Sequence, residues 1–160
     1  MNNIKINPFN NNIETGLRVL TILNATFPKA YDLQSILYLD YLTVHSGDIS
    51  IENKSLHPPV PNRKGEIFVR REIIYSSLEL FISKGLIKRL YLENGIEYVA
   101  SESSTTFLES LNEEYSIKLQ TMSNWVNEFV NKHQEVKLKD YMLRYLTDSS
   151  SNLIKINSND

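Results

Sequence analysis

The chain has 160 residues, of which 41% are hydrophobic and 22% charged, and its formal net charge is −2. This composition is typical of one globular domain that is long enough to bury a core of its own. Because the sequence contains no cysteine, disulfides, thiolate catalysis and cysteine-ligated zinc are excluded. No apolar run approaches the ~18–20 residues of a membrane-spanning helix, and the polar N-terminus lacks a signal core, so we expect a cytoplasmic protein.

Charge is unevenly distributed along the chain. Residues 63–89 carry seven basic and three acidic side chains, a net charge of +4, whereas residues 90–160 carry six basic and eleven acidic ones, a net charge of −5. A basic centre of this size is compatible with nucleic-acid binding but is too mild to establish it.

Helical periodicity begins after an Asn-rich segment, residues 1–12, which we expect to be an extended arm. Apolar residues recur on one stripe through residues 13–27, which predicts a first helix that Pro28 ends. Asp32 is placed to cap a second helix, residues 33–45, whose two opposite faces are both apolar. A helix of this kind is sandwiched, either within its own core or beneath a partner protein.

The next segment, residues 46–65, contains two glycines and three prolines without periodicity, which predicts a long loop. Long loops in compact domains are often functional. A third helix is expected over residues 66–84, with apolar residues on two stripes, and Lys84-Gly85 supplies its C-terminal cap.

Two short strand-like runs, Leu86–Leu92 and Ile96–Ala100, follow the third helix and flank Asn94-Gly95, a favoured tight turn. The serines of Ser101-Glu-Ser-Ser then offer an N-cap for a further helix. The order of three helices, a hairpin and another helix predicts a mainly α (α+β) fold: a winged helix-turn-helix with a two-stranded wing and a C-terminal helical extension.

The C-terminal third is expected to be helical. Apolar residues recur from Leu108 to Phe129 as on one face of a single long helix, and a last helix is expected over about 136–147. These patterns divide the chain into an arm (1–12), a winged-helix-like domain (13–110), a C-terminal helical extension (111–147) and a polar tail (148–160).

Two of the three histidines, His45 and His57, lie in or beside the expected loop, close in sequence to Asp48. Because imidazole titrates near neutrality and ligates metals, one interpretation is a metal-dependent hydrolase built on these three residues. However, two histidines twelve residues apart form no established metal-binding spacing. We favour a structural interpretation, in which the imidazoles hydrogen-bond the loop backbone and hold the loop against the core.

Asp40 falls on an apolar face of the second predicted helix. A carboxylate there would be costly unless it is paired. It could be an acid with a raised pKa, but we favour a structural pair with Arg18, Arg70 or Arg71, or with a hydroxyl such as that of Tyr41.

Four basic residues lie where a winged helix contacts DNA: Arg70 and Arg71 on the third helix, and Lys88 and Arg89 on the wing. The third predicted helix carries apolar residues on two of its faces, whereas a helix that reads DNA presents polar residues to the groove. We therefore rank protein contact ahead of DNA contact, since winged helices serve both purposes. The scattered glycines form no phosphate-binding loop, and no cofactor is expected.

Several short motifs occur in one order along residues 7–130. They are Asn7-Pro-Phe-Asn10, Glu14-Thr-Gly-Leu-Arg18, Tyr38-Leu-Asp-Tyr41, His45-Ser-Gly-Asp48, Ser55-Leu-His-Pro58 and Val69-Arg-Arg-Glu72. Together they resemble the middle component of bacterial ABC-three-component systems, also met in Lamassu-type antiphage operons. The glycines usual after the His-Ser-Gly-Asp motif are replaced here by Ser50-Ile-Glu-Asn-Lys54. The resemblance implies a small winged-helix-like subunit, without catalytic residues, that couples an SMC/Rad50-like ATPase to an effector, often a nuclease.

We therefore expect a non-catalytic adaptor of a bacterial defence complex that responds to foreign DNA, with no membrane partner. Its expected partner-binding residues are Tyr38, Leu42, His45, Asp48 and His57. Two alternatives remain open: a DNA-binding transcription regulator that uses the four basic residues, and the metal-dependent hydrolase. The first predicts salt-sensitive affinity for duplex DNA, and the second predicts bound metal in the purified protein.

Overall fold

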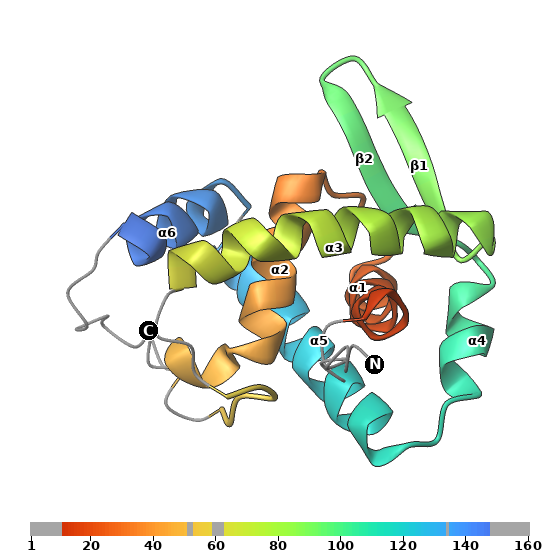
Figure 1. Ribbon diagram of the computed structural model, residues 1–160, viewed down its shortest axis with the longest axis horizontal. Helices are drawn as coiled ribbons and strands as arrows, with labels where there is room; N and C mark the ends of the chain where they lie inside the picture. The colour runs from red at the N-terminus through yellow and green to blue at the C-terminus, as the bar shows by residue number, and fades with distance from the viewer. Residues whose placement is uncertain (1–10, 51–52, 59–62, 134, 148–160) are drawn as a thin grey trace, which may run out of the picture.

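The computed structural model describes residues 11–50, 53–58, 63–133 and 135–147. Within these residues the protein is mostly helical with one two-stranded antiparallel sheet, an α+β arrangement (Figure 1). Its elements in chain order are α1 (Asn12–Ala25), α2 (Leu33–Val44), the 3-10 turn η1 (Ser46–Asp48), α3 (Arg63–Ser83), β1 (Ile87–Leu92), β2 (Gly95–Ala100), α4 (Ser104–Glu109), α5 (Glu114–His133) and α6 (Glu135–Thr147). The expected arm (residues 1–10 of it) and the polar tail lie outside the described residues.

Side-chain caps fix the starts of the first two helices. The Asn11 carboxamide oxygen accepts from the Glu14 amide at 2.8 Å, and the Asp32 carboxylate accepts from the Ser35 amide at 2.7 Å. Each cap satisfies a backbone N–H that has no partner within its helix. The cap predicted at Asp32 is thus confirmed.

The second helix, α2, is buried on all sides. Every residue from Ser35 to Val44 is buried, and the helix contacts α1, α3, α5, α6 and β2. Its two apolar faces are therefore both covered by other elements of the same chain. This settles the choice left open by the sequence pattern: α2 is sandwiched within its own core.

The hairpin forms where it was expected, with its turn shifted by one residue. Leu92 pairs with Gly95, so the two loop residues are Glu93 and Asn94, and Gly95 begins β2 with a φ of +131°. The cap predicted at Gly85 is confirmed by its φ of +72°, a conformation that glycine adopts without penalty. The hairpin projects away from the helices (Figure 1).

The prediction of a single long helix from Leu108 to Phe129 is wrong. Instead α4 ends at Glu109, and α5 begins at Glu114. Ser110 donates its hydroxyl to the Phe107 carbonyl at 2.6 Å, a local bond that competes with helix continuation. The N-cap of α4 falls on Ser103, one of the expected serines, but its side chain makes no capping bond. The hydroxyl of the next residue, Ser104, donates to the Leu86 carbonyl at 2.7 Å.

One hydrophobic core spans the described helices. Residues of α5 and α6 belong to the same buried cluster as those of α1, α2 and α3: Val126, Val130, Leu138, Met142 and Tyr145. The core therefore crosses the boundary expected at residue 110. Within the described ranges, no helix combines the length and the apolar character needed to cross a membrane.

Candidate functional site

Asp40 is the centre of a buried ion-pair network. Its side chain has no exposed surface, and its two oxygens accept from different arginines: Oδ1 from Arg18 Nε at 2.9 Å and Oδ2 from Arg70 Nη1 at 2.5 Å. Burial alone would raise the pKa of this carboxyl, but the two guanidinium groups outweigh it and lower the pKa. The structural pair with Arg18 and Arg70 is thus confirmed, and Asp40 is an ion-pair partner that stays charged.

Glu66 extends the network along α3. Its Oε1 accepts from Arg70 Nε at 2.8 Å and lies 2.6 Å from Arg70 Nη2, and the same oxygen is 3.0 Å from His45 Nε2. Burial raises the Glu66 pKa, but the hydrogen bonds from His45 and Arg70 outweigh burial. The net result is a lowered Glu66 pKa. Two arginines and two carboxylates therefore balance in charge inside the protein.

His57 joins the network from the loop that follows η1. Its amide donates to the Val44 carbonyl at 3.0 Å, and its Nε2 lies 3.1 Å from the Tyr115 hydroxyl on α5. Burial, with Arg18 and Arg70 adding repulsion, lowers the pKa of His57 to about 4. His57 is therefore neutral near pH 7, and its ring packs edge-to-face on His45 with a centroid separation of 6.4 Å.

Asp48, at the end of η1, is tied to the last helix. Its Oδ2 accepts from the Tyr145 hydroxyl at 3.0 Å, and that hydroxyl lies 3.2 Å from the hydroxyl of Tyr41. The Tyr41 ring in turn packs on His45 at 4.7 Å. The two imidazoles, expected to hydrogen-bond the loop backbone, instead contact side chains of other helices: His45 contacts Glu66 of α3, and His57 contacts Tyr115 of α5.

The three residues of the metal-site interpretation have separate partners. His45 bonds Glu66, His57 bonds Tyr115, and Asp48 bonds Tyr145. Among the described residues, no three histidine, aspartate or glutamate side chains are grouped so that they could hold a metal ion. The arrangement supports a structural role, in which the network joins α1, α2, α3 and α5.

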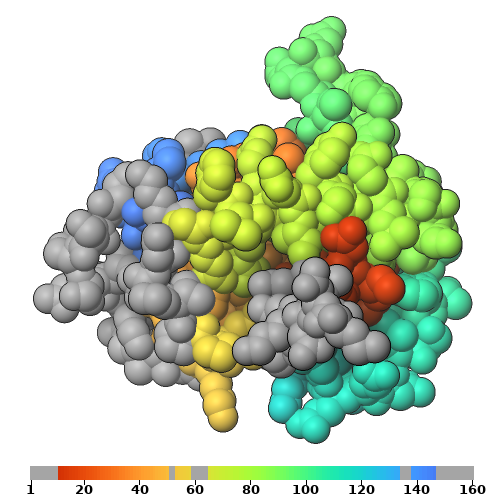
Figure 2. All heavy atoms as spheres, viewed as in Figure 1, coloured from red at the N-terminus to blue at the C-terminus, as the bar shows by residue number. Residues whose placement is uncertain are grey.

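The outer face of α3 presents large apolar side chains to solvent. Phe68 is 79% exposed, Val69 71% and Tyr75 50%. Phe68 and Tyr75 line a groove of about 470 Å³ together with Leu33, Arg71 and Glu72. In Figure 2 this helix crosses the front of the molecule. We call Phe68, Val69 and Tyr75 the α3 patch.

A second exposed apolar group lies at the tip of the hairpin. Tyr91 is 74% exposed, Leu92 50% and Ile96 44%, and Tyr91 pairs with Ile96 across the strands. We call these three residues the wing patch. Tyr91 and Ile96 therefore share one face of the hairpin, and Leu92, the next residue of β1, lies on the other face. Exposed apolar side chains that gather in this way are typical of interaction surfaces.

The basic residues proposed for DNA contact are engaged with other side chains. Arg70 is buried in the network, and Arg71 donates to the Gln34 carboxamide at 3.1 Å. Lys88 pairs with Glu102 at 2.8 Å, and Arg89 pairs with Glu79. Arg70 is the least accessible of the four, and DNA contact through any of them stays a prediction.

A family model described as the ABC-three component (ABC-3C) system Middle Component 2 matches residues 8–152. The chain belongs to this family. The comparisons with curated proteins and with solved structures gave no match.

In this Middle Component 2 protein, the residues expected to bind a partner are placed mostly inside. Tyr38, Leu42, His45 and His57 are buried, because the second face of α2 and the loop are covered by the chain itself. They present little surface in this fold, and partner contact at these four residues stays a prediction. Partner contact at the half-buried Asp48 stays a prediction.

The two exposed patches were missed by the sequence reasoning. For the α3 patch a signal was available, since Phe68 and Tyr75 are seven residues apart and lie beside the buried Ile67–Ile74 stripe. For the wing patch, the alternation of side chains along the strands could not predict which residues are exposed, because both faces of the hairpin carry apolar residues. Their exposure depends on how far the hairpin projects from the helices.

Proposed function

We propose that this protein is a non-catalytic adaptor in a bacterial defence complex of the Lamassu-like, ABC-three-component kind. In this proposal it couples an SMC/Rad50-like ABC ATPase to an effector of the nuclease class when foreign DNA is present. Membership of the Middle Component 2 family supports a role within an ABC-three-component system. We also propose that α1, α2, α3 and the hairpin form a winged helix, which the element order supports.

The observation that carries the adaptor role is the pair of separate exposed patches. A subunit that bridges two proteins needs two surfaces, and the α3 patch and the wing patch are formed by different elements. Aromatic residues dominate the energetics of protein interfaces, and each patch contains at least one. By contrast, the titratable groups suggested by the sequence for catalysis are paired within the fold.

The first test is co-expression with the ATPase and the effector that the proposal requires, followed by size-exclusion chromatography. We expect the adaptor to elute with both partners. Consistent elution of the adaptor separately from the ATPase would overturn the proposal.

A pair of variants gives a sharper test, and each serves as the control for the other. Phe68→Ala/Tyr75→Ala alters the α3 patch, and Tyr91→Ala/Ile96→Ala alters the wing patch. Because all four side chains are exposed, both variants should keep the wild-type melting temperature within a few degrees. We expect each to lose roughly tenfold or more in affinity for one partner while keeping the other. Retention of both partners by both variants would contradict the bridging arrangement.

A further inference from the structure

A polar pocket lies on a part of the molecule that neither patch uses. It is formed by the end of α1, by α4 and by α5, and has a volume of about 190 Å³. Its lining consists of Thr21, Asn24, Ala25, Thr105, Leu108, Glu109, Gln120 and Asn124. A single water needs only about 10–15 Å³ of such space, so the pocket has room for a larger group.

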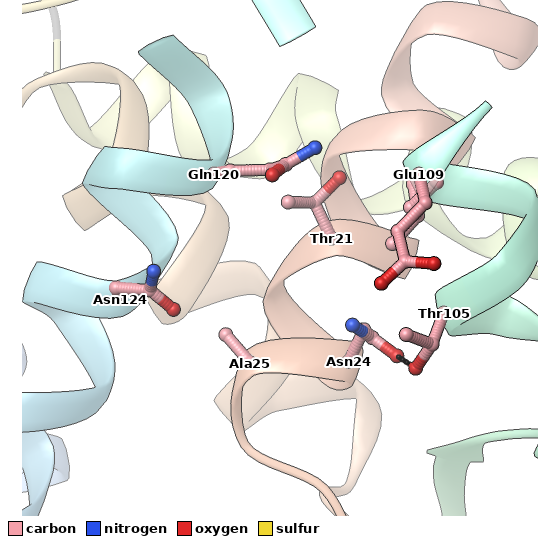
Figure 3. A pocket seen from close by; sticks show the side chains of 8 residues that line it. Thr21, Asn24, Ala25, Thr105, Glu109, Gln120 and Asn124 are labelled. Atoms are coloured by element: carbon pink, nitrogen blue, oxygen red, sulfur yellow. Dashed lines mark hydrogen bonds between the residues drawn. The ribbon is translucent and has the colours of Figure 1, made fainter. Parts of the chain in front are cut away.

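Polar side chains from three helices surround this pocket (Figure 3). The Glu109 carboxylate comes from α4, the Gln120 and Asn124 carboxamides from α5, and the Asn24 carboxamide from α1. Asn24 Oδ1 already accepts from the Thr105 hydroxyl at 2.9 Å. For Glu109, Gln120 and Asn124, the described part of the chain supplies no hydrogen-bond or ion-pair partner. Three groups are thus available to a ligand.

The electrostatics of the pocket favour a cation. It lies at the C-terminal end of α1, where the helix dipole is negative, and the last turn of α1 carries no basic residue. Residues 101–130 contain five glutamates and one lysine, a net charge of −4. That lysine, Lys118, is already paired with Glu114 at 2.6 Å. None of the eight lining residues is basic.

We propose that this pocket binds a guanidinium group, and that its occupant is an arginine side chain of a partner protein. A guanidinium is planar and has five N–H donors, which suits one carboxylate and carboxamide oxygens arranged around it. It is also less strongly hydrated than an ammonium group, so its flat face can pack on the apolar part of the lining, Ala25 and Leu108. No pocket residue belongs to either patch, so guanidinium binding can be tested independently of the two patches.

The test is a titration of the isotope-labelled full chain with methylguanidinium, monitored through the side-chain carboxamide signals of Asn24, Gln120 and Asn124. We expect saturable shifts of these signals. Urea, which has the same planar shape without the charge, should cause none, and methylammonium should bind at least about fivefold more weakly. Absence of saturation, equal shifts with urea, or equal affinity for methylammonium would overturn the guanidinium assignment.

Two variants locate the binding. Glu109→Gln keeps the shape of the side chain and should weaken methylguanidinium binding about tenfold, the loss expected for a charge-assisted hydrogen bond. Glu113→Gln removes the same charge four residues away, outside the lining, and should bind as the wild type does. Equal affinity of Glu109→Gln and the wild type would overturn the site. Both glutamates are exposed, so both variants should stay folded, which their melting temperatures will check.

A last comparison identifies the source of the group. A capped peptide, acetyl-Gly-Arg-Gly-amide, should bind at least as tightly as free arginine, because a partner's side chain brings no charged backbone ends. Tighter binding of free arginine would overturn the partner-protein occupant in favour of a small molecule.

Discussion

At the scale of single residues, the stability of this protein depends strongly on Asp40. It pairs with two buried arginines, and removing one member of a buried pair leaves a charge without compensation. We predict that Asp40→Ala lowers the free energy of unfolding by about 3–5 kcal/mol, measured by urea denaturation. The exposed Asp140→Ala should cost less than about 0.5 kcal/mol. A loss below about 1 kcal/mol for Asp40→Ala would mean that the network is not needed for folding.

His57 makes stability depend on pH in a defined window. Its pKa is lowered from 6.5 to about 4 in the folded protein, so between these values the unfolded chain binds the extra proton. Stability is therefore fully present above about pH 6.5 and is lost as the pH falls towards 4. The full shift corresponds to about 3 kcal/mol, and residual solvent screening reduces our expectation to about 1–2 kcal/mol.

The check for His57 is the free energy of unfolding at several pH values between 4 and 7 for the wild type and His57→Gln. Glutamine can still reach the Tyr115 hydroxyl but does not titrate, so we predict a flatter pH dependence for the variant. An unchanged slope in this window would assign the effect to other groups.

At the scale of elements, α1 and α3 approach closely because α1 has a glycine at the contact. A Cβ atom added at Gly16 would overlap the ring of Phe81 on α3. We predict that Gly16→Ala lowers the free energy of unfolding by about 1–3 kcal/mol through overpacking, although alanine is the better helix former.

A double-mutant cycle separates these effects. In a Phe81→Leu background, the smaller side chain leaves room for the new methyl group, so Gly16→Ala should be less costly by about 1 kcal/mol or more. Equal costs in both backgrounds would show that the helices shift apart without strain.

At the scale of the whole molecule, the continuous core predicts that residues 1–110 do not form an independent domain. Removing α5 and α6 takes Val126, Val130 and Met142 out of the buried cluster and removes the Tyr115 partner of His57. We expect a fragment of residues 1–110 to lack a cooperative thermal transition by circular dichroism, whereas the full chain unfolds in one step. A sharp transition of the fragment would support the division at residue 110.

The order and limits of most elements could be predicted because their signals are local. Asp32 caps the helix that follows it, and Gly85 adopts a conformation that suits few other residues. The family motifs are local too, and they led to the family that the chain belongs to. The prediction of a continuous helix failed at residues 110–113 for a local reason as well. The apolar spacing continues across Ser110, but the Ser110 side chain competes with the helix backbone for hydrogen bonds.

The sequence by itself determined the first three helices and the hairpin to within a few residues, and that a carboxylate on the apolar face of α2 must be paired. Only the tertiary structure decided which cations pair with it, because Arg18 and Arg70 come from helices whose contacts depend on packing over long sequence separations. It also decided that α2 is covered from within and that Phe68 and Tyr91 are exposed. Apolar character shows that a side chain can be buried, and the number of elements around it decides whether it is.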